Sequence, residues 1–173
     1  YLHLYQKKQK MCPSVLTMVN WTARTEKFCN PVEEGIITSS CGERQNPILE
    51  KQEFHDGLDI AVPEGTEVVA VKSGTVTQIR QSQTFGLVVE YETSDGFVVQ
   101  YAHLQDTLVT EGEKLTQGQV MAKSGNSGLS TGPHLHYSLR KDEIIVDPMP
   151  YVTLPYTAEV SAEYEARGES VPK

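Results

Sequence analysis

The chain has few cysteines, and this scarcity excludes two classes of protein. Its three cysteines, Cys12, Cys29 and Cys41, form no CxxC pair. A set that is odd in number and widely spaced builds neither a disulfide framework nor a thiolate metal site. We expect the three to be small buried hydrophobic residues. A Cys12–Cys29 disulfide in an oxidising compartment is the alternative.

Net positive charge and long apolar runs are also absent. The formal net charge is −8, which argues against nucleic-acid binding because phosphate neutralisation requires Lys and Arg. No run approaches the roughly 20 apolar residues that span a bilayer. The first residue is Tyr1 rather than Met. We therefore expect that an upstream segment, with a signal peptide or a membrane anchor as candidates, has been removed.

The length of 173 residues suits one domain with extensions, and composition divides the chain into three zones. Residues 1–32 are largely basic and irregular and form an N-terminal extension to which the sequence assigns no role. Residues 33–153 carry the domain. Residues 154–173 form a C-terminal tail, of which residues 158–173 are acid-rich and short of large apolar side chains. We expect this tail to be flexible and loosely ordered.

The central zone is predicted to be β almost throughout, because short apolar runs recur between Gly, Asp and Ser. The expected strands lie at residues 68–71, 75–79, 86–91, 97–101, 120–122 and 134–139. Ser94-Asp95-Gly96 separates two of them and predicts a hairpin. No amphipathic helix of ten or more residues stands out in this zone. The pattern predicts an all-β domain, a small antiparallel sheet in two layers.

Four of the five histidines lie in this central zone, at spacings that suit strand geometry. They occur in the motifs His55-Asp56-Gly57-Leu58-Asp59, Tyr101-Ala102-His103-Leu104 and Gly132-Pro133-His134-Leu135-His136. Because side chains alternate faces along a strand, His55 and Asp59 share a face if their segment is extended. His134 and His136 do so as well. By the same count, Tyr101 and Val99 share the face of His103.

Two strands could thus direct three imidazoles and a carboxylate at one point, which is the ligand chemistry of zinc. A catalytic zinc keeps one position for water and lowers the pKa of that water to about 7. Hydrolysis also needs a proton acceptor and a group that stabilises the oxyanion. With four histidines and one aspartate, three groups can hold metal and two imidazoles remain. A closed structural zinc site is the alternative, but it commonly uses Cys.

In this order and with these glycines, the motifs resemble the M23 zinc metallopeptidases of the lysostaphin or LytM type, which cut peptide bonds in bacterial peptidoglycan. The resemblance covers roughly residues 35–150. Besides the histidine motifs it includes residues 37–44, 65–70, 74–76 and 125–131. Two departures are visible. Cys41 stands where the family often has an aromatic residue, and Glu67 replaces a common proline.

The resemblance implies a role for each cluster residue. His55 and Asp59 match the family's HxxxD motif, and His136 matches the second histidine of its HxH motif; these three would be the ligands of Zn²⁺. His134 and His103 match the two histidines that stay off the metal and activate the water or stabilise the oxyanion. The implied fold is a small antiparallel β-domain of the LytM type with the site in a groove. Substrate-binding residues are not identified.

The function implied is a zinc-dependent endopeptidase that hydrolyses peptide bonds of peptidoglycan, in the cell envelope or outside a bacterium. The expected partners are peptidoglycan peptides, and no nucleic acid is expected. The alternative is a non-hydrolytic regulator or scaffold of a cell-envelope complex, for example of the sporulation type, because a protein can keep its zinc and act through its surface. An envelope protein would then be the partner, and the first 30 residues are the candidate contact. The sequence does not select the bond that is cut.

Overall fold

The computed structural model describes residues 26–45 and 51–172, except for the side chains of Arg44 and Gln45. Most of the N-terminal extension, including Cys12, lies outside these residues, so the alternative of a Cys12–Cys29 disulfide stays a prediction. Within them, no helix is both long enough and apolar enough to cross a bilayer.

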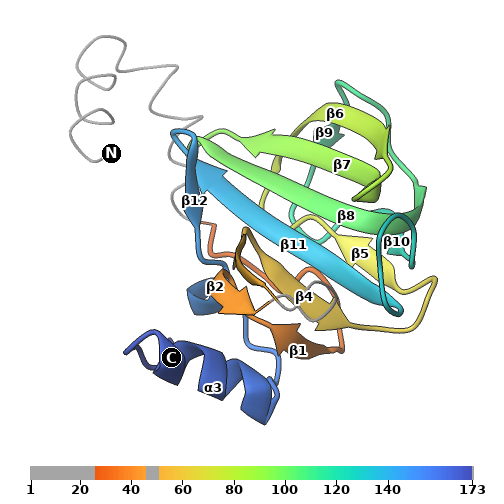
Figure 1. The fold of residues 1–173 in the computed structure, drawn as a ribbon. Coiled ribbons are helices and arrows are strands. Elements are labelled where there is room, and N and C mark those ends of the chain that lie inside the picture. Colours follow the sequence, from red (N-terminus) through yellow and green to blue (C-terminus); the bar gives the residue numbers. More distant parts are fainter. Residues whose placement is uncertain (1–25, 46–50, 173) are drawn as a thin grey trace, which may run out of the picture.

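The central zone folds into a strongly curved antiparallel sheet (Figure 1), as the sequence predicts. Among the described residues, ten strands are hydrogen-bonded into this sheet. They are β1 (Ile36–Ser39), β4 (Leu58–Ala61), β5 (Glu67–Val69), β6 (Gly74–Ser82), β7 (Gly86–Thr93), β8 (Phe97–Thr107), β9 (Lys114–Leu115), β10 (Val120–Ser124), β11 (His134–Lys141) and β12 (Ile144–Val146).

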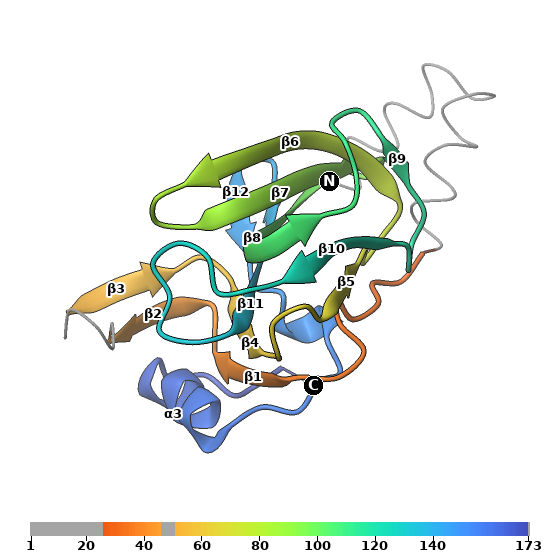
Figure 2. The same cartoon turned by 90° about the vertical axis from the view of Figure 1, so that its right-hand side faces the viewer.

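The strand order brings the histidine motifs together. Along the sheet it is β1-β4-β11-β8-β7-β6-β9, so β4, β11 and β8 are neighbours. A separate antiparallel pair, β2 (Gly42–Gln45) and β3 (Gln52–His55), projects beside the sheet (Figure 2). Since β3 leads into β4, all three motifs fall at adjoining strands.

The expected strands agree with the observed ones over most of their length. The segments expected at 75–79, 86–91, 97–101, 120–122 and 134–139 lie within β6, β7, β8, β10 and β11. Of the segment 68–71, only Val68 and Val69 belong to a strand, β5. The hairpin predicted at Ser94–Gly96 joins β7 to β8, and the amide of Gly96 donates to the carbonyl of Thr93.

One face of the three central strands forms the core. Leu58, Tyr101 and Tyr137 are fully buried there, and the register pairs Tyr137 with both Leu58 and Tyr101. The rings of Tyr101 and Tyr137 are 5.7 Å apart between centroids. Because side chains alternate along each strand, the opposite face is left to Asp59 and His136.

The prediction of a loosely ordered C-terminal tail is wrong. Residues Ala158–Ala166 form a helix, α3, beside β1 (Figures 1 and 2). Val160 is fully buried, Tyr164 is almost so, and the Tyr164 hydroxyl donates to Asp147. Composition misleads here because the two buried apolar side chains of α3, Val160 and Tyr164, are four residues apart. This spacing places both on one helical face, which is enough to hold a short helix against the core.

Cys29 and Cys41, the two described cysteines, form no disulfide with each other. Cys41 is buried, as expected, and Cys29 is half-buried, with its thiol donating to the carbonyl of Ala70. Burial raises the pKa of Cys29, and it raises that of Cys41 to about 12. Both therefore stay protonated at neutral pH, and a thiolate is what metal binding would require.

Candidate metal centre

The histidine and aspartate motifs meet on the face of the sheet opposite the tyrosines. His136 on β11 lies opposite both Asp59 on β4 and Ala102 on β8. One potential ligand atom from each of His55, Asp59 and His136 lies within 4.8 Å of the other two. Ligands bound about 2 Å from one zinc ion are separated by about 3–4 Å in tetrahedral geometry. The cluster therefore needs only small shifts to surround a metal ion.

His55 and Asp59 approach each other through a corner rather than along one extended strand. His55 ends β3, and the chain turns at Asp56 and Gly57 before β4 begins. The turn still places His55 Nε2 3.3 Å from Asp59 Oδ1. The corner depends on Gly57, because a Cβ there would lie 2.3 Å from the carbonyl oxygen of Tyr137.

His103 reaches the cluster through a β-bulge. Its φ is 58°, and the register between β8 and β7 shifts between Tyr101 and Leu104. The His103 ring lies 4.8 Å from the ring of His134 and 6.2 Å from that of His136, whereas Tyr101 faces the core. The expectation that Tyr101 and Val99 share the face of His103 is therefore wrong, since a bulge interrupts the alternation.

Backbone carbonyls fix the rings of three histidines through Nδ1. The acceptors are Ser40 for His55 (2.9 Å), Ser127 for His103 (2.6 Å) and Gly132 for His134 (2.8 Å). A carbonyl oxygen can only accept, so each Nδ1 carries a hydrogen and donates it. In the neutral ring, Nε2 then keeps its lone pair. The Nε2 atoms of His55 and His134 lie 3.3 and 3.7 Å from Asp59 Oδ1.

His136 differs from the other three histidines, because carboxylates rather than backbone carbonyls hold its ring. Its Nε2 lies 2.8 Å from Asp56 Oδ1, and its Nδ1 lies 3.0 Å from Asp59 Oδ1. When the neutral ring donates from Nε2 to Asp56, Nδ1 is the atom left to bind a metal. The sequence analysis missed Asp56. A carboxylate next to a proposed ligand is a weak signal, and the pairing of β4 with β11 that brings it to His136 is not visible in the sequence.

The two carboxylates dominate the electrostatics of the cluster. Burial lowers the pKa of His136, but hydrogen bonds to Asp56 and Asp59 outweigh this and raise it to about 9. Burial raises the pKa of Asp59, but hydrogen bonds from His136 and His55 outweigh it and hold this pKa well below the ordinary value. The hydrogen bond from His136 also lowers the pKa of Asp56. Ionised carboxylates beside imidazole lone pairs form a donor set that fits zinc.

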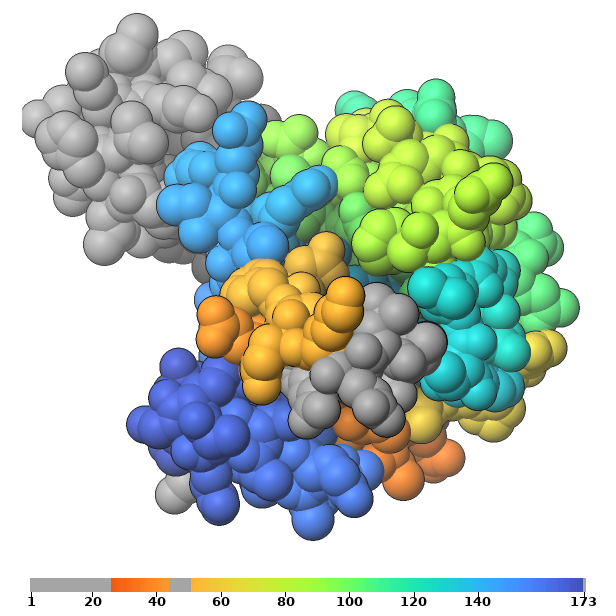
Figure 3. All heavy atoms as spheres, in the orientation of Figure 1, coloured from red at the N-terminus to blue at the C-terminus, as the bar shows by residue number. Residues whose placement is uncertain are grey.

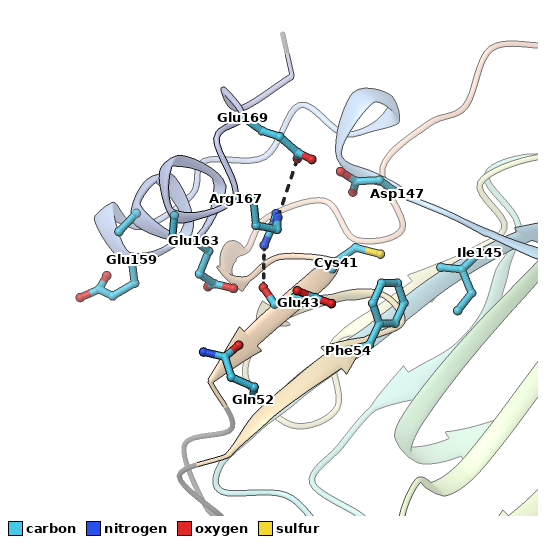
Figure 4. A pocket seen from close by; sticks show the side chains of 13 residues that line it. Cys41, Glu43, Gln52, Phe54, Ile145, Asp147, Glu159, Glu163, Arg167 and Glu169 are labelled. Carbon is cyan, nitrogen blue, oxygen red and sulfur yellow. Dashed lines mark hydrogen bonds and ion pairs between the residues drawn. The ribbon is translucent and has the colours of Figure 1, made fainter.

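Two hollows lie in the neighbourhood of the cluster. One, of about 380 Å³, is lined by Leu104, Gln105 and Ser127 among others, and Leu104 follows His103 on β8. A groove of about 860 Å³ lies between α3 and the β2–β3 pair (Figure 4). Phe54 lines this groove and precedes His55 on β3, so the two side chains point to opposite faces. The larger groove therefore lies behind the cluster and holds none of its ligand atoms.

Comparison with known proteins agrees with this geometry. The model of the family described as peptidase family M23 matches residues 53–148, which include the whole histidine and aspartate cluster. The peptidoglycan DD-endopeptidase ShyA of Vibrio cholerae is 38% identical over 96 residues, which are 56% of this chain and 22% of ShyA. Stage II sporulation protein Q of Bacillus subtilis is 34% identical over 119 residues, 66% of this chain and 42% of that protein. The chain thus spans less than half the length of either relative.

Solved structures share the fold. A zinc-containing peptidase from Vibrio cholerae superposes with a TM-score of 0.67 and 30% identity, over 75% of this chain and 41% of that one. The catalytic domain of lysostaphin from Staphylococcus simulans superposes with a TM-score of 0.63 and 26% identity, over 77% of this chain and 96% of that one. The predicted antiparallel fold of the lysostaphin type is confirmed.

Proposed function

The chain belongs to peptidase family M23, and from this premise we propose that it is a zinc-dependent endopeptidase that hydrolyses peptide bonds in bacterial peptidoglycan. The observation that carries the proposal is the convergence of His55, Asp59 and His136 beside two further imidazoles. The names of two similar proteins support the substrate and the metal, since one is a peptidoglycan DD-endopeptidase and the other contains zinc.

Three side chains hold the metal in this proposal: His55 through Nε2, Asp59 through its carboxylate and His136 through Nδ1. Zinc bound there supplies a Lewis acid and a coordinated water with a pKa of about 7. Asp56 orients His136 by accepting its Nε2 hydrogen, at 2.8 Å. The carbonyl of Ser40 orients His55 by accepting its Nδ1 hydrogen, at 2.9 Å. Partners of this kind fix the tautomer and direction of a ligand ring.

His103 and His134 carry the proton transfer and the stabilisation of the oxyanion. Both rings donate from Nδ1 to a backbone carbonyl, so Nε2 is the atom that can exchange a proton with water or substrate. Burial lowers the pKa of His103, which keeps this ring neutral at neutral pH. A neutral imidazole can accept a proton, as a general base must.

The substrate places the proposed enzyme in the cell envelope or outside a bacterium. A second candidate function is that of a regulator or scaffold in an envelope complex, which the 34% identity to stage II sporulation protein Q favours. The intact cluster favours the enzyme, because a scaffold has no need of two imidazoles beside three metal ligands.

Digestion of purified peptidoglycan tests the enzyme against the scaffold. Sacculi of several wall types are incubated with the protein, with and without a zinc chelator, and the products are read by mass spectrometry. New peptide ends that disappear with chelator support the hydrolase and identify the bond. No new ends from protein that carries one zinc per chain would contradict the enzyme and favour the scaffold.

A further inference from the structure

Helix α3 lies outside the residues that match the M23 family model, 53–148, yet it is connected to the metal cluster through hydrogen bonds. The connection passes through Ser40, which is fully buried. The Ser40 carbonyl accepts the Nδ1 hydrogen of His55 at 2.9 Å. Ser40 is therefore the residue that determines which nitrogen of His55 keeps its lone pair.

Glu163 on α3 accepts two hydrogen bonds from Ser40. Its Oε2 accepts from the Ser40 hydroxyl at 3.0 Å and from the Ser40 amide at 3.4 Å. Both bonds end on one carboxylate oxygen of a half-buried side chain. Hydrogen bonds to a charged group are roughly twice as strong as neutral ones. The placement of Ser40 thus depends on a residue 108 positions away from His55 in the sequence.

Arg167, one helical turn after Glu163, contacts the same segment of the chain. Its Nη2 donates to the Ser40 hydroxyl at 3.3 Å. Its Nη1 donates to the carbonyl of Glu43 at 3.1 Å (Figure 4). The guanidinium lies against Gly42, whose φ is +119°, and a Cβ on this glycine would lie 3.1 Å from Arg167 Cζ. The segment from Ser40 to Glu43 is therefore shaped around this side chain.

Helix α3 is docked by contacts other than those of Glu163 and Arg167. Val160 and Tyr164 are buried in the core, and the Tyr164 hydroxyl bonds Asp147. In space-filling view the helix lies against the β2–β3 pair (Figure 3). Apolar burial supplies the docking free energy, while Glu163 and Arg167 direct their polar groups at the segment that supports His55.

We propose that α3 is a positioning element of the metal centre, in which Glu163 and Arg167 fix Ser40 and Ser40 fixes His55 with its hydrogen on Nδ1 and its lone pair on Nε2. The identity of the metal rests on the proposed function. The position of the Nδ1 hydrogen does not, and it can be measured without metal.

The test compares Glu163→Ala with Glu165→Ala. Both remove a glutamate from the same helix, but the Glu165 side chain is exposed and makes a matched control. Glu163→Gln is the conservative variant, because its amide oxygen can still accept from Ser40. Zinc affinity is measured by competition with a chromophoric chelator. The His55 tautomer is read in the metal-free protein from imidazole nitrogen NMR shifts, assigned with His55→Gln.

Outer partners of metal ligands typically contribute 10–100-fold to affinity, and the indirect action of Glu163 places it at the lower end, about tenfold. Glu163→Ala should weaken zinc binding by that factor and turn His55 from the Nδ1-protonated form into a mixture of tautomers. Glu163→Gln should lose less, and Glu165→Ala should stay within about twofold of wild type.

Equal zinc affinities and an unchanged His55 tautomer in Glu163→Ala and Glu165→Ala would overturn the proposal. A wild-type protein that binds no zinc would instead overturn the proposed function. In that case the tautomer measurement still decides whether α3 positions His55. Circular dichroism of Glu163→Ala shows that the readouts come from a folded protein, and Glu163→Gln provides them if the alanine variant unfolds.

Discussion

Asp56 accepts a hydrogen bond from Nε2 of His136 at 2.8 Å, between the corner that joins β3 to β4 and the middle of β11. This contact leaves Nδ1 of His136 facing Asp59 at 3.0 Å. It also means that a residue outside the three ligands selects which nitrogen of His136 can bind metal.

Asp56→Asn should weaken zinc binding by about tenfold or more, since outer carboxylates of ligand histidines act on this scale. The amide can still accept from Nε2, but it lacks the charge that makes the imidazole a better ligand. Isothermal or chelator-competition titration measures the loss. Glu92→Gln, on an exposed position of β7, is the control. Unchanged affinity in Asp56→Asn would remove Asp56 from the metal centre.

The metal-free protein should lose stability as the pH rises from about 6.5 to 9. The pKa of His136 is raised to about 9 in the folded state and is about 6.5 when unfolded. Its contribution is therefore complete below about pH 6.5 and is lost as the pH passes through the folded value. His103, whose pKa is lowered, acts in the other direction and below pH 6.5, so it leaves this window undisturbed.

Zinc should reverse this trend, because a bound metal takes the place of the Nδ1 proton on His136. The difference in Tm between zinc-loaded and chelator-treated protein should grow steadily from pH 6.5 to 9. Thermal unfolding at several pH values with and without chelator measures it. A Tm of the metal-free protein that does not fall across this range would contradict the assigned protonation of His136.

Substitution of a metal ligand and substitution of either remaining histidine should have different effects on zinc content and activity. Asp59→Ala and His136→Ala should lose zinc and activity together. His134→Ala and His103→Ala should keep zinc and lose turnover by roughly 10²–10⁴, the usual range for acid–base groups. Metal content by elemental analysis and peptidoglycan hydrolysis are measured on the same samples. Hydrolysis retained in His134→Ala would break this division of roles.

The sequence predicts local features of this protein better than distant contacts. Short apolar runs predict most of β6, β7 and β11 and the first part of β8. The His-x-His spacing on β11 correctly predicts that His134 and His136 share a face. The bulge at His103 is invisible to that count, because it depends on how β8 pairs with β7 and β10. The contacts of Asp56 with His136 and of Glu163 with Ser40 join residues 80 and 123 positions apart, and no local pattern encodes them.

Gly57 provides the last test, because it links the corner to the strand that bears His136. A Cβ at this position would lie 2.3 Å from the Tyr137 carbonyl oxygen. This atom belongs to the backbone of β11, so it cannot move aside as the end of a flexible side chain could. Gly57→Ala should therefore push β11 from the corner, with a loss of about 1–3 kcal/mol of unfolding free energy, as overpacking costs. Zinc affinity should fall as well, because His136 moves with β11 while His55 moves with the corner.

Gly132→Ala is the matched control, since a Cβ there meets nothing within 4 Å and the residue lies in the loop before His134. Its unfolding free energy should stay within about 0.5 kcal/mol of wild type, as is usual for surface changes. Urea unfolding of both variants, followed by zinc titration, gives the comparison. If Gly57→Ala unfolds and binds zinc like Gly132→Ala, the close approach of the corner to β11 is not what holds the ligands together.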